Sequence, residues 1–412
     1  MSKSQLSENE TAASAGTPIV LLVVFCGLLM ALSGFTTDIM LPAFNTMVVK
    51  LDTSLDMVQG TIAAFSFAFG IGQFFYGPAS DKYGRRPAIA VGMAIFIAGS
   101  LFATFGPNIE TVLIGRALQG LGGGAAPVLA RAILRDTHTG TALARAMALS
   151  MAIFAIGPII APLAGYFLVE SMGWRSTFGF TGALALGLLI FNWLGYRETN
   201  QNQNPDALRA SRLWSGVKTI VSNHQSSYFL ACGCLAYCAL FTYISNAPRI
   251  YANAFNITGF GFAFLFATTG LGIVLGQVFN RTLLPRLGIL TMLRIASTVL
   301  LASSTIITLM AWFGLLDFVG FTVLMFCFNT SFLVVISNTA TLCLDPHPKL
   351  AGIASAFYGC VTNISGSAFI VVTVSVVGMS VIHWGVAMML TTGLCAIAIW
   401  LASPGKLAFR DA

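Results

Sequence analysis

The sequence predicts an all-α integral membrane protein with 12 transmembrane helices in two six-helix bundles. Charged residues make up only 8% of the 412 residues and hydrophobic residues 57%, whereas soluble domains carry about 25% charged residues. The chain contains 12 apolar runs of about 20 residues, the length that spans a hydrocarbon core of ~30 Å. One long polar segment, residues 197–226, separates the sixth run from the seventh. Lipid is therefore the expected solvent of most of the chain.

The predicted spans follow one another with short polar connections. They cover residues 18–41, 57–78, 87–106, 110–134, 144–169, 175–196, 227–250, 260–283, 289–313, 318–343, 351–377 and 383–403. Residues 1–17 form a polar tail without a small-residue cleavage site, so the first run is expected to stay in the protein as a span. The expected organisation is a cytoplasmic tail at 1–17, a first bundle at 18–196, a cytoplasmic linker at 197–226, a second bundle at 227–403 and a tail at 404–412.

A short repeat favours duplicated halves. Gly72-Gln73 recurs as Gly276-Gln277, and Lys82-x-Gly84 recurs at the same offset (276 minus 72, or 204 residues) as Arg286-x-Gly288. Parallel repeats of this kind occur in transporters built from two related bundles. The second copy lacks the aspartate and the double arginine of the first, so any gating chemistry is expected to be weighted to the first half.

The positive charge of the chain is explained by membrane topology. The net charge is +7, from 21 Lys and Arg against 14 Asp and Glu. With the amino terminus inside, only Lys50, Arg175 and Arg249 face outward and Arg116 lies within a span, while the other basic residues fall on the cytoplasmic side. This asymmetry is the positive-inside rule. It predicts both termini in the cytoplasm, a multi-pass protein of the bacterial inner membrane, and no nucleic-acid partner.

The cysteines and the glycine runs do not indicate a cofactor. All eight cysteines lie within predicted spans, and Cys232, Cys234 and Cys238 have a spacing that does not place all three on one helix face, as a metal site would need. The glycine runs lie inside spans without the Lys-Ser/Thr of a phosphate loop. We expect no cofactor and no metal.

The most informative loop is GPASDKYGRRP, residues 77–87, between the second and third runs. Gly77 and Gly84 break helices, and Arg85 and Arg86 hold the turn on the cytoplasmic side. Asp81 precedes the next helix, where the helix dipole favours a carboxylate. A generic basic stop-transfer loop is the alternative interpretation.

The order of these residues resembles the signature loop of the major facilitator superfamily, roughly Gly-x-x-x-Asp-Arg/Lys-x-Gly-Arg-Arg/Lys. The resemblance implies the major facilitator fold, and a loop that lies beside the inner ends of the second-half helices when the transporter faces outward. Asp136 follows the fourth span on the same side of the membrane. Asp81, Arg85 and Asp136 are therefore expected to form a cytoplasmic latch.

Very few charged residues lie within the spans, where a charge costs at least ~2.5 kcal/mol. Asp38 lies near the outer end of the first span, and Arg116 lies about six residues into the fourth, so both occupy the outer half of the membrane. We expect them to face one cavity and to couple proton movement to transport. The alternatives are a solvated interfacial carboxylate for Asp38 and a snorkelling or purely structural arginine for Arg116.

Further motifs resemble the antiporter branch of the same family. Arg116-Ala-Leu-Gln119-Gly120 is similar to a fourth-span motif linked there to proton coupling, and Gly157-Pro158 is similar to the fifth-span antiporter motif. The proline breaks a helical hydrogen bond and gives the bundle a place to bend. Asp38-x-x-Leu-Pro42 and Gly173-Trp174-Arg175 resemble drug exporters of the bicyclomycin-resistance type. Several relatives carry a second acid earlier in the first span, but residues 27–37 contain none.

The substrate cavity is predicted from polar and aromatic residues within spans. Amides and phenols at this depth either bond to one another between helices or face a substrate, and Phe and Met suit an adaptable apolar pocket. The candidates are Phe65, Phe69, Gln73, Gln119, Met151, Phe154, Tyr237, Asn329, Tyr358 and Asn363. Packing between helices is the alternative for each of them.

The sequence as a whole predicts a monomeric secondary active exporter that exchanges protons for a drug-like or siderophore-like small molecule. A gradient-coupled importer of a small metabolite is the close alternative. An intramembrane enzyme or a sensor is the alternative from a different class, but it would need clustered polar residues at depth, and the four histidines fall in loops or at span ends.

Overall fold

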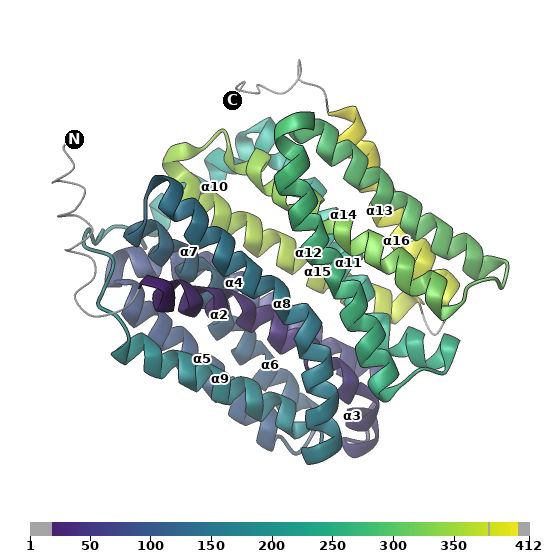
Figure 1. Cartoon of the computed structure of the whole chain (residues 1–412). Helices are drawn as coiled ribbons and strands as arrows, with labels where there is room; N and C mark the ends of the chain where they lie inside the picture. Colours follow the sequence, from purple (N-terminus) through teal and green to yellow (C-terminus); the bar gives the residue numbers. More distant parts are fainter. Residues whose placement is uncertain (1–18, 378–379, 403–412) are drawn as a thin grey trace.

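Figure 1 shows the computed structural model, which describes residues 19–377 and 380–402. These residues form helices joined by short turns, and no strand occurs among them. The first half contains α2 (Ile19–Asp38), η1 (Leu41–Ala43), α3 (Phe44–Lys50), α4 (Leu55–Tyr83), α5 (Arg85–Phe105), α6 (Ile109–Gly123), α7 (Ala125–Thr137), α8 (Gly140–Met172) and α9 (Arg175–Leu194).

The second half follows a short helix in the predicted linker. Its elements are α10 (Ala210–Ser222), α11 (His224–Phe255), α12 (Gly259–Leu287), α13 (Ile289–Trp312), α14 (Phe318–Leu344), η2 (Pro348–Leu350), α15 (Ala351–Val377) and α16 (Val381–Leu401).

The described part of the chain holds 12 helical segments that are long and apolar enough to cross a membrane, which confirms the predicted all-α fold with 12 spans. The first span combines α2, η1 and α3, and the fourth combines α6 and α7. Several helices extend past the apolar runs by one or two turns, because backbone hydrogen bonding continues into the polar ends. The orientation of the termini stays a prediction, and the two tails lie outside the described residues.

The helices pack in two groups (Figure 1). In the first group α2 packs on α8, α4 on α6, and α5 on α6 and α9. In the second group α11 packs on α14, α15 and α16, while α13 packs on α14 and α16 and α12 on α14. The groups meet mainly where α4 packs along α15 and α8 along α12. The exact boundaries of two domains stay a prediction.

Close helix packing depends on glycine at the contact between α4 and α6. A Cβ atom at Gly120 would lie 2.0 Å from the Phe65 carbonyl oxygen, and one at Gly72 would lie 2.3 Å from the Leu121 carbonyl oxygen. Backbone therefore lies against backbone, as small residues allow in lipid. This contact sets the position of the cavity-facing side of α4.

The helix α4 crosses the whole molecule and defines its two ends. It begins after Ser54, whose hydroxyl accepts a hydrogen bond from the Met57 amide (3.2 Å), and it ends at Gly84, which has φ +102°. Asn204 bonds to the carbonyl of Asp81 near its end. We call the end near Tyr83 the linker end and the end near Leu55 the distal end.

The predicted linker contains an ordered helix. Leu213, Gly216 and Ile220 are the buried residues of α10 and recur at the spacing of one helix face. The helix packs on α15, and a Cβ atom at Gly216 would lie 3.1 Å from Ile353. Trp214, on another face, is exposed. This short amphipathic pattern lies inside a polar segment, where composition obscures it.

Candidate substrate cavity

A cavity of about 280 Å³ lies between the two helix groups. Its walls come from α2, α4, α7 and α8 of the first group and from α11, α12, α14 and α15 of the second. The volume is close to the lower limit of typical small-molecule pockets. Eight of the ten predicted substrate residues line it: Phe65, Phe69, Gln73, Met151, Phe154, Tyr237, Asn329 and Asn363.

Aromatic rings form much of the wall. The rings of Phe65 and Phe69 stack with centroids 5.7 Å apart. Across the cavity, Tyr237 makes edge contacts with Phe241 at 5.7 Å and with Phe332 at 5.6 Å. The apolar body of a ligand would therefore meet aromatic faces and edges from both helix groups.

Amide groups supply the polar part of the wall. The Asn329 Nδ2 donates to the Thr269 carbonyl (3.0 Å), and the Asn363 Nδ2 donates to the Gly359 carbonyl (2.8 Å). The Oε1 atom of Gln73 and the Oδ1 atom of Asn329 are buried and have no hydrogen-bond partner among the described residues. These two acceptors are suited to donors on a bound solute or on water.

Two predicted substrate residues do not line the cavity. Gln119 is fully buried, and its Nε2 donates to Ser100 Oγ at 2.8 Å. The hydroxyl of Tyr358 lies 2.8 Å from Thr339 Oγ1. Both side chains hold helices together, which is the packing role that sequence reasoning had left open for them.

Asp38 lines the cavity at the carboxyl end of α2 and is only 6% exposed. No hydrogen bond or ion pair joins its side chain to another described residue. A buried carboxylate without partners is stable only when it is protonated or when a cation reaches it. Among the described residues that line the cavity, Asp38 is the only acid.

Arg116 does not share this cavity, contrary to the sequence-based expectation. It is fully buried, and its Nε donates to the Thr61 carbonyl (3.3 Å) while its Nη1 donates to Gln119 Oε1 (2.9 Å). The guanidinium lies 4.2 Å from the centroid of Phe65, and Phe65 itself lines the cavity. Arg116 therefore supports a wall residue from behind. The amphipathic pattern of the fourth span does not reveal this rotation.

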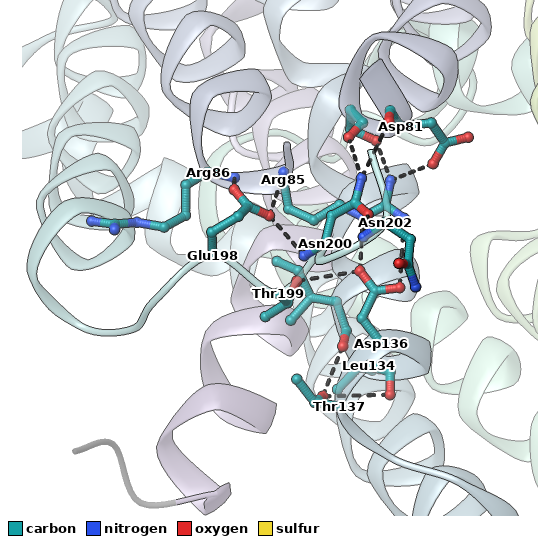
Figure 2. A network of polar contacts seen from close by, with 12 residues as sticks. Asp81, Arg85, Arg86, Leu134, Asp136, Thr137, Glu198, Thr199, Asn200 and Asn202 are labelled. Atoms are coloured by element: carbon teal, nitrogen blue, oxygen red, sulfur yellow. Dashed lines mark hydrogen bonds and ion pairs between the residues drawn. The ribbon is translucent and has the colours of Figure 1, made fainter. Parts of the chain in front are cut away.

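A polar network at the linker end brings the predicted latch residues together (Figure 2). The guanidinium of Arg85 contacts Asp81 Oδ1 (2.6 Å) and Asp136 Oδ2 (2.8 Å), and Arg85 also donates to Ser80 Oγ (2.6 Å). Thr199 donates to Asp136 Oδ2 at 3.2 Å. Every hydrogen-bonding partner that the described residues offer Arg85 lies in the first helix group or directly after it. The resemblance implies a contact with second-half helices in the outward-facing state, and no described residue of the second group forms a hydrogen bond or ion pair with Arg85 here.

Glu198 is a member of this network that the sequence did not indicate. Its two carboxylate oxygens accept hydrogen bonds from the backbone amides of Arg85 (2.8 Å) and Arg86 (2.9 Å), which caps the first turn of α5 (Figure 2). A Cβ atom at Gly84 would lie 2.6 Å from Glu198 Oε2, and φ at Gly84 is positive. The partner comes from 113 residues further along the chain, so no local pattern points to it.

The other predicted gating residues have separate roles. Arg86 turns away from Arg85, donates to the carbonyls of Asn192 (3.0 Å) and Trp193, and so closes the carboxyl end of α9. Gly77 lies beside Val128 of α7. Pro158, next to Gly157, lines the cavity, and its carbonyl approaches Gly270 of α12 at the contact between the two groups.

A second polar cluster, which the sequence analysis missed, joins the two groups at the distal end. Arg249 of α11 forms an ion pair with Asp56 of α4 (Nη2 to Oδ1, 2.5 Å). One turn further along α4, Gln59 donates to the Ser245 carbonyl (2.8 Å) and to Asn246 Oδ1 (3.3 Å). We call these five residues the distal clasp. The sequence predicts that Arg249 faces outward, but it does not indicate the contact with Asp56.

Arg131 is a further cavity residue that the sequence analysis missed. The predicted fourth span ends at residue 134, which places Arg131 near its cytoplasmic end. In the structure α7 continues to Thr137, and Arg131 lines the cavity together with Pro127. The absence of a helix breaker between residues 131 and 137 was the available signal.

Comparison with known proteins identifies the family of this chain. Residues 24–370 match the family model described as Major Facilitator Superfamily. The chain is 26% identical over 390 residues to a bicyclomycin resistance protein homolog of Haemophilus influenzae, covering 93% of this chain and 95% of that protein. It is 28% identical over 347 residues to multidrug resistance protein D of Escherichia coli, covering 83% and 86%. The crystal structure of a D-xylose-proton symporter superposes with a TM-score of 0.74 at 14% identity, covering 92% and 96%.

Proposed function

This chain belongs to the Major Facilitator Superfamily, and we propose that it exports a drug-like or siderophore-like small molecule in exchange for protons. The sequence-based resemblance to the bicyclomycin-resistance type is confirmed by the family match and by relatives named as resistance proteins. With 12 spans and bacterial relatives, the chain is a multi-pass protein of the inner membrane.

One observation carries the transport mechanism: the cavity lies between two helix groups, and the hydrogen bonds and ion pairs that the described residues form across the interface lie at one end of it. The distal clasp connects α4 to α11, whereas the hydrogen bonds of Arg85 at the linker end stay within the first group and the segment after it. By the positive-inside rule the linker end faces the cytoplasm. This arrangement corresponds to an inward-facing state of an alternating-access cycle.

Asp38 is the proposed proton carrier. Among the described residues it is the single acid in the cavity wall, and its side chain makes no hydrogen bond or ion pair with any of them. Its charge is therefore tolerated only when the cavity supplies water or a cation. A change in access from one side of the membrane to the other would expose the same carboxyl group to two proton reservoirs in turn. Protons and the solute would then enter and leave through the same cavity.

Arg116 is proposed to act by position. Its hydrogen bond to the Thr61 carbonyl links α6 to α4, and its contact with Phe65 fixes one wall of the cavity beside Asp38. Movement of α4 relative to α6 would alter that wall. Arg116 thus influences proton release indirectly and does not itself carry the proton.

The latch residues at the linker end are proposed to form a rigid platform. Arg85 bridges Asp81 of α4 and Asp136 of α7, so three helices and the segment after α9 move together. In the outward-facing state, the platform would meet the inner ends of the second group, in line with the family resemblance. The charges act together, because both carboxylates share one guanidinium whose side chain is only 10% exposed.

The test is transport by purified protein in liposomes with an imposed pH gradient, preceded by a growth screen of efflux-deficient bacteria against neutral, cationic and zwitterionic toxins. Wild-type protein is expected to move a toxin identified in the screen against the proton flow. Asp38→Asn should keep expression but lose gradient-driven movement. The matched control is Asp52→Asn at the distal end, which removes the same charge from an exposed loop outside the cavity.

The direction of movement separates export from the importer alternative. Exchange of internal protons for external solute in inside-out liposomes supports export, whereas solute and protons moving in the same direction would overturn it. Full gradient-driven transport by Asp38→Asn would refute the assignment of the proton carrier.

A further inference from the structure

We propose that Arg131 is a binding site for an anionic group, such as a carboxylate, phosphate or sulfonate, on the transported solute. Arg131 lies on α7, six residues before that helix ends, and its side chain lines the central cavity. Pro127, one turn earlier, lines the same cavity. One face of α7 is therefore turned toward the ligand space, with the guanidinium on that face.

Arg131 differs from the other arginines that are not fully exposed. Each of those has a hydrogen-bonding partner that the structure describes: Arg85 with Asp81 and Asp136, Arg86 with Asn192, Arg116 with Gln119, Arg175 with Gly106, Arg249 with Asp56, and Arg294 with Ala402. Among the described residues, Arg131 takes part in no hydrogen bond, ion pair or contact with an aromatic face.

The only acid in the cavity wall is too distant to neutralise Arg131. The separation between Asp38 and Arg131 can be estimated along α4, which passes close to both. Thr61 of α4 contacts Met40, which is two residues after Asp38. Gly77 of α4 lies next to Val128, which is three residues before Arg131. The interval from 61 to 77 is 16 residues, which corresponds to roughly 24 Å of helix. Asp38 and Arg131 thus lie toward opposite ends of the cavity.

The wall between these two charges is mainly apolar and aromatic, with rings that include Phe65, Phe69 and Phe154. A guanidinium presents a planar set of donors that matches carboxylate and phosphate oxygens. The cavity therefore suits a solute with an apolar body and one anionic group. The anionic group would lie at the linker end, and the body would extend toward Asp38.

The charge moved in each transport cycle also favours an anionic solute; this argument rests on the proposed export function. In one cycle a proton enters on Asp38 and a monovalent anion leaves, so two positive charges move inward in net terms. An inside-negative membrane potential favours both movements. A single acid in the first span is then sufficient, whereas one proton exchanged for a monovalent cation would move no net charge.

Two fluorescent probes that differ by one sulfonate group test the site. The probes are 8-anilinonaphthalene-1-sulfonate, an anion, and N-phenyl-1-naphthylamine, its neutral counterpart. Binding to purified full-length protein is measured in phosphatidylcholine nanodiscs without a gradient, for wild type, Arg131→Met, Arg131→Lys and Arg135→Ala. Arg135 is exposed on the same helix and does not line the cavity, so it is the matched control.

Arg131→Met is expected to weaken binding of the anionic probe about tenfold or more and to leave the neutral probe within twofold of wild type. Arg131→Lys should give an intermediate loss, because the charge remains but the planar fork is lost. Arg135→Ala should match wild type for both probes. An equal loss of both probes, or no loss of either, in an Arg131→Met protein that unfolds at the wild-type temperature would overturn the proposal.

The same measurement with phosphatidylglycerol added to the nanodiscs distinguishes a lipid headgroup from a solute. Unchanged affinity for the anionic probe supports a solute site, whereas displacement of the probe by the anionic lipid in wild type alone would overturn the assignment to a solute. Transport is measured separately in liposomes. If wild-type protein shows no proton-driven transport, the proposed function is refuted. The nanodisc measurements would still decide whether Arg131 binds the anionic probe selectively.

Discussion

Removal of the distal clasp is expected to shift the conformational equilibrium toward an outward-facing state. The residues of the distal clasp join the two helix groups at the distal end. Their contacts are the Asp56–Arg249 pair at 2.5 Å and the two hydrogen bonds that Gln59 donates. The perturbation is the double variant Asp56→Asn/Gln59→Leu. Both positions lie in the first two turns of α4, and neither residue lines the cavity.

The magnitude follows from the exposure of the partners. The Asp56 side chain is 51% exposed and that of Arg249 is 9% exposed, so solvent screening limits the ion pair to about 1 kcal/mol. Gln59 is fully buried, and a buried hydrogen bond contributes about 1 kcal/mol. The double variant should therefore lose about 2 kcal/mol of preference for the closed distal end, or a factor of about 30 in the conformational ratio.

The assay is distance measurement between spin labels at Lys50 and Thr258, which lie at the distal end in different helix groups. The labels require a background in which the eight native cysteines are replaced. We expect a population with longer distances to appear in the double variant. The charge-swapped variant Asp56→Arg/Arg249→Asp should recover part of the short-distance population, and Asp52→Asn should resemble wild type. A distance distribution unchanged in the double variant would refute the reasoning.

Three further outcomes follow from the same structure. Arg85→Ala should slow transport and reduce the unfolding free energy by about 1–3 kcal/mol, because two carboxylates lose their partner. Thermal unfolding measures the stability and initial rates measure the transport, and unchanged values in both would exclude the platform. Gly84→Ala should also lower the unfolding free energy, by about 1–2 kcal/mol, because φ at Gly84 is positive and the new Cβ would meet Glu198. The loss should be smaller in a Glu198→Ala background, and an equal loss in both backgrounds would contradict the contact. Arg116→Lys should impair coupling more than solute binding, since lysine cannot keep the planar contacts with Thr61 and Gln119; wild-type coupling ratios would show that its position is unimportant.

The number, order and approximate ends of the membrane spans follow from the amino-acid sequence alone. Apolar length is a local property, and the cost of an unsatisfied backbone group in lipid forces each such run to be helical. The residues of the 77–87 loop likewise predicted the turn at Gly84, since the glycine and the flanking charges act over a few residues. The pairing of Arg85 with Asp81 is local as well, because the two residues are four positions apart in the sequence, on either side of the turn at Gly84.

The facing of side chains within each span depends on the tertiary structure. Most spans are apolar on all sides, so they carry no periodic signal that tells the lipid face from the cavity face. Arg131 enters the cavity, Arg116 lies behind Phe65, and Gln119 bonds to Ser100, although all three belong to one span. Their different surroundings arise from helix rotation and from close backbone packing at glycines. The contacts of Glu198 with Arg85 and of Asp56 with Arg249 join residues more than 100 positions apart, and only the packing of distant helices brings such residues together.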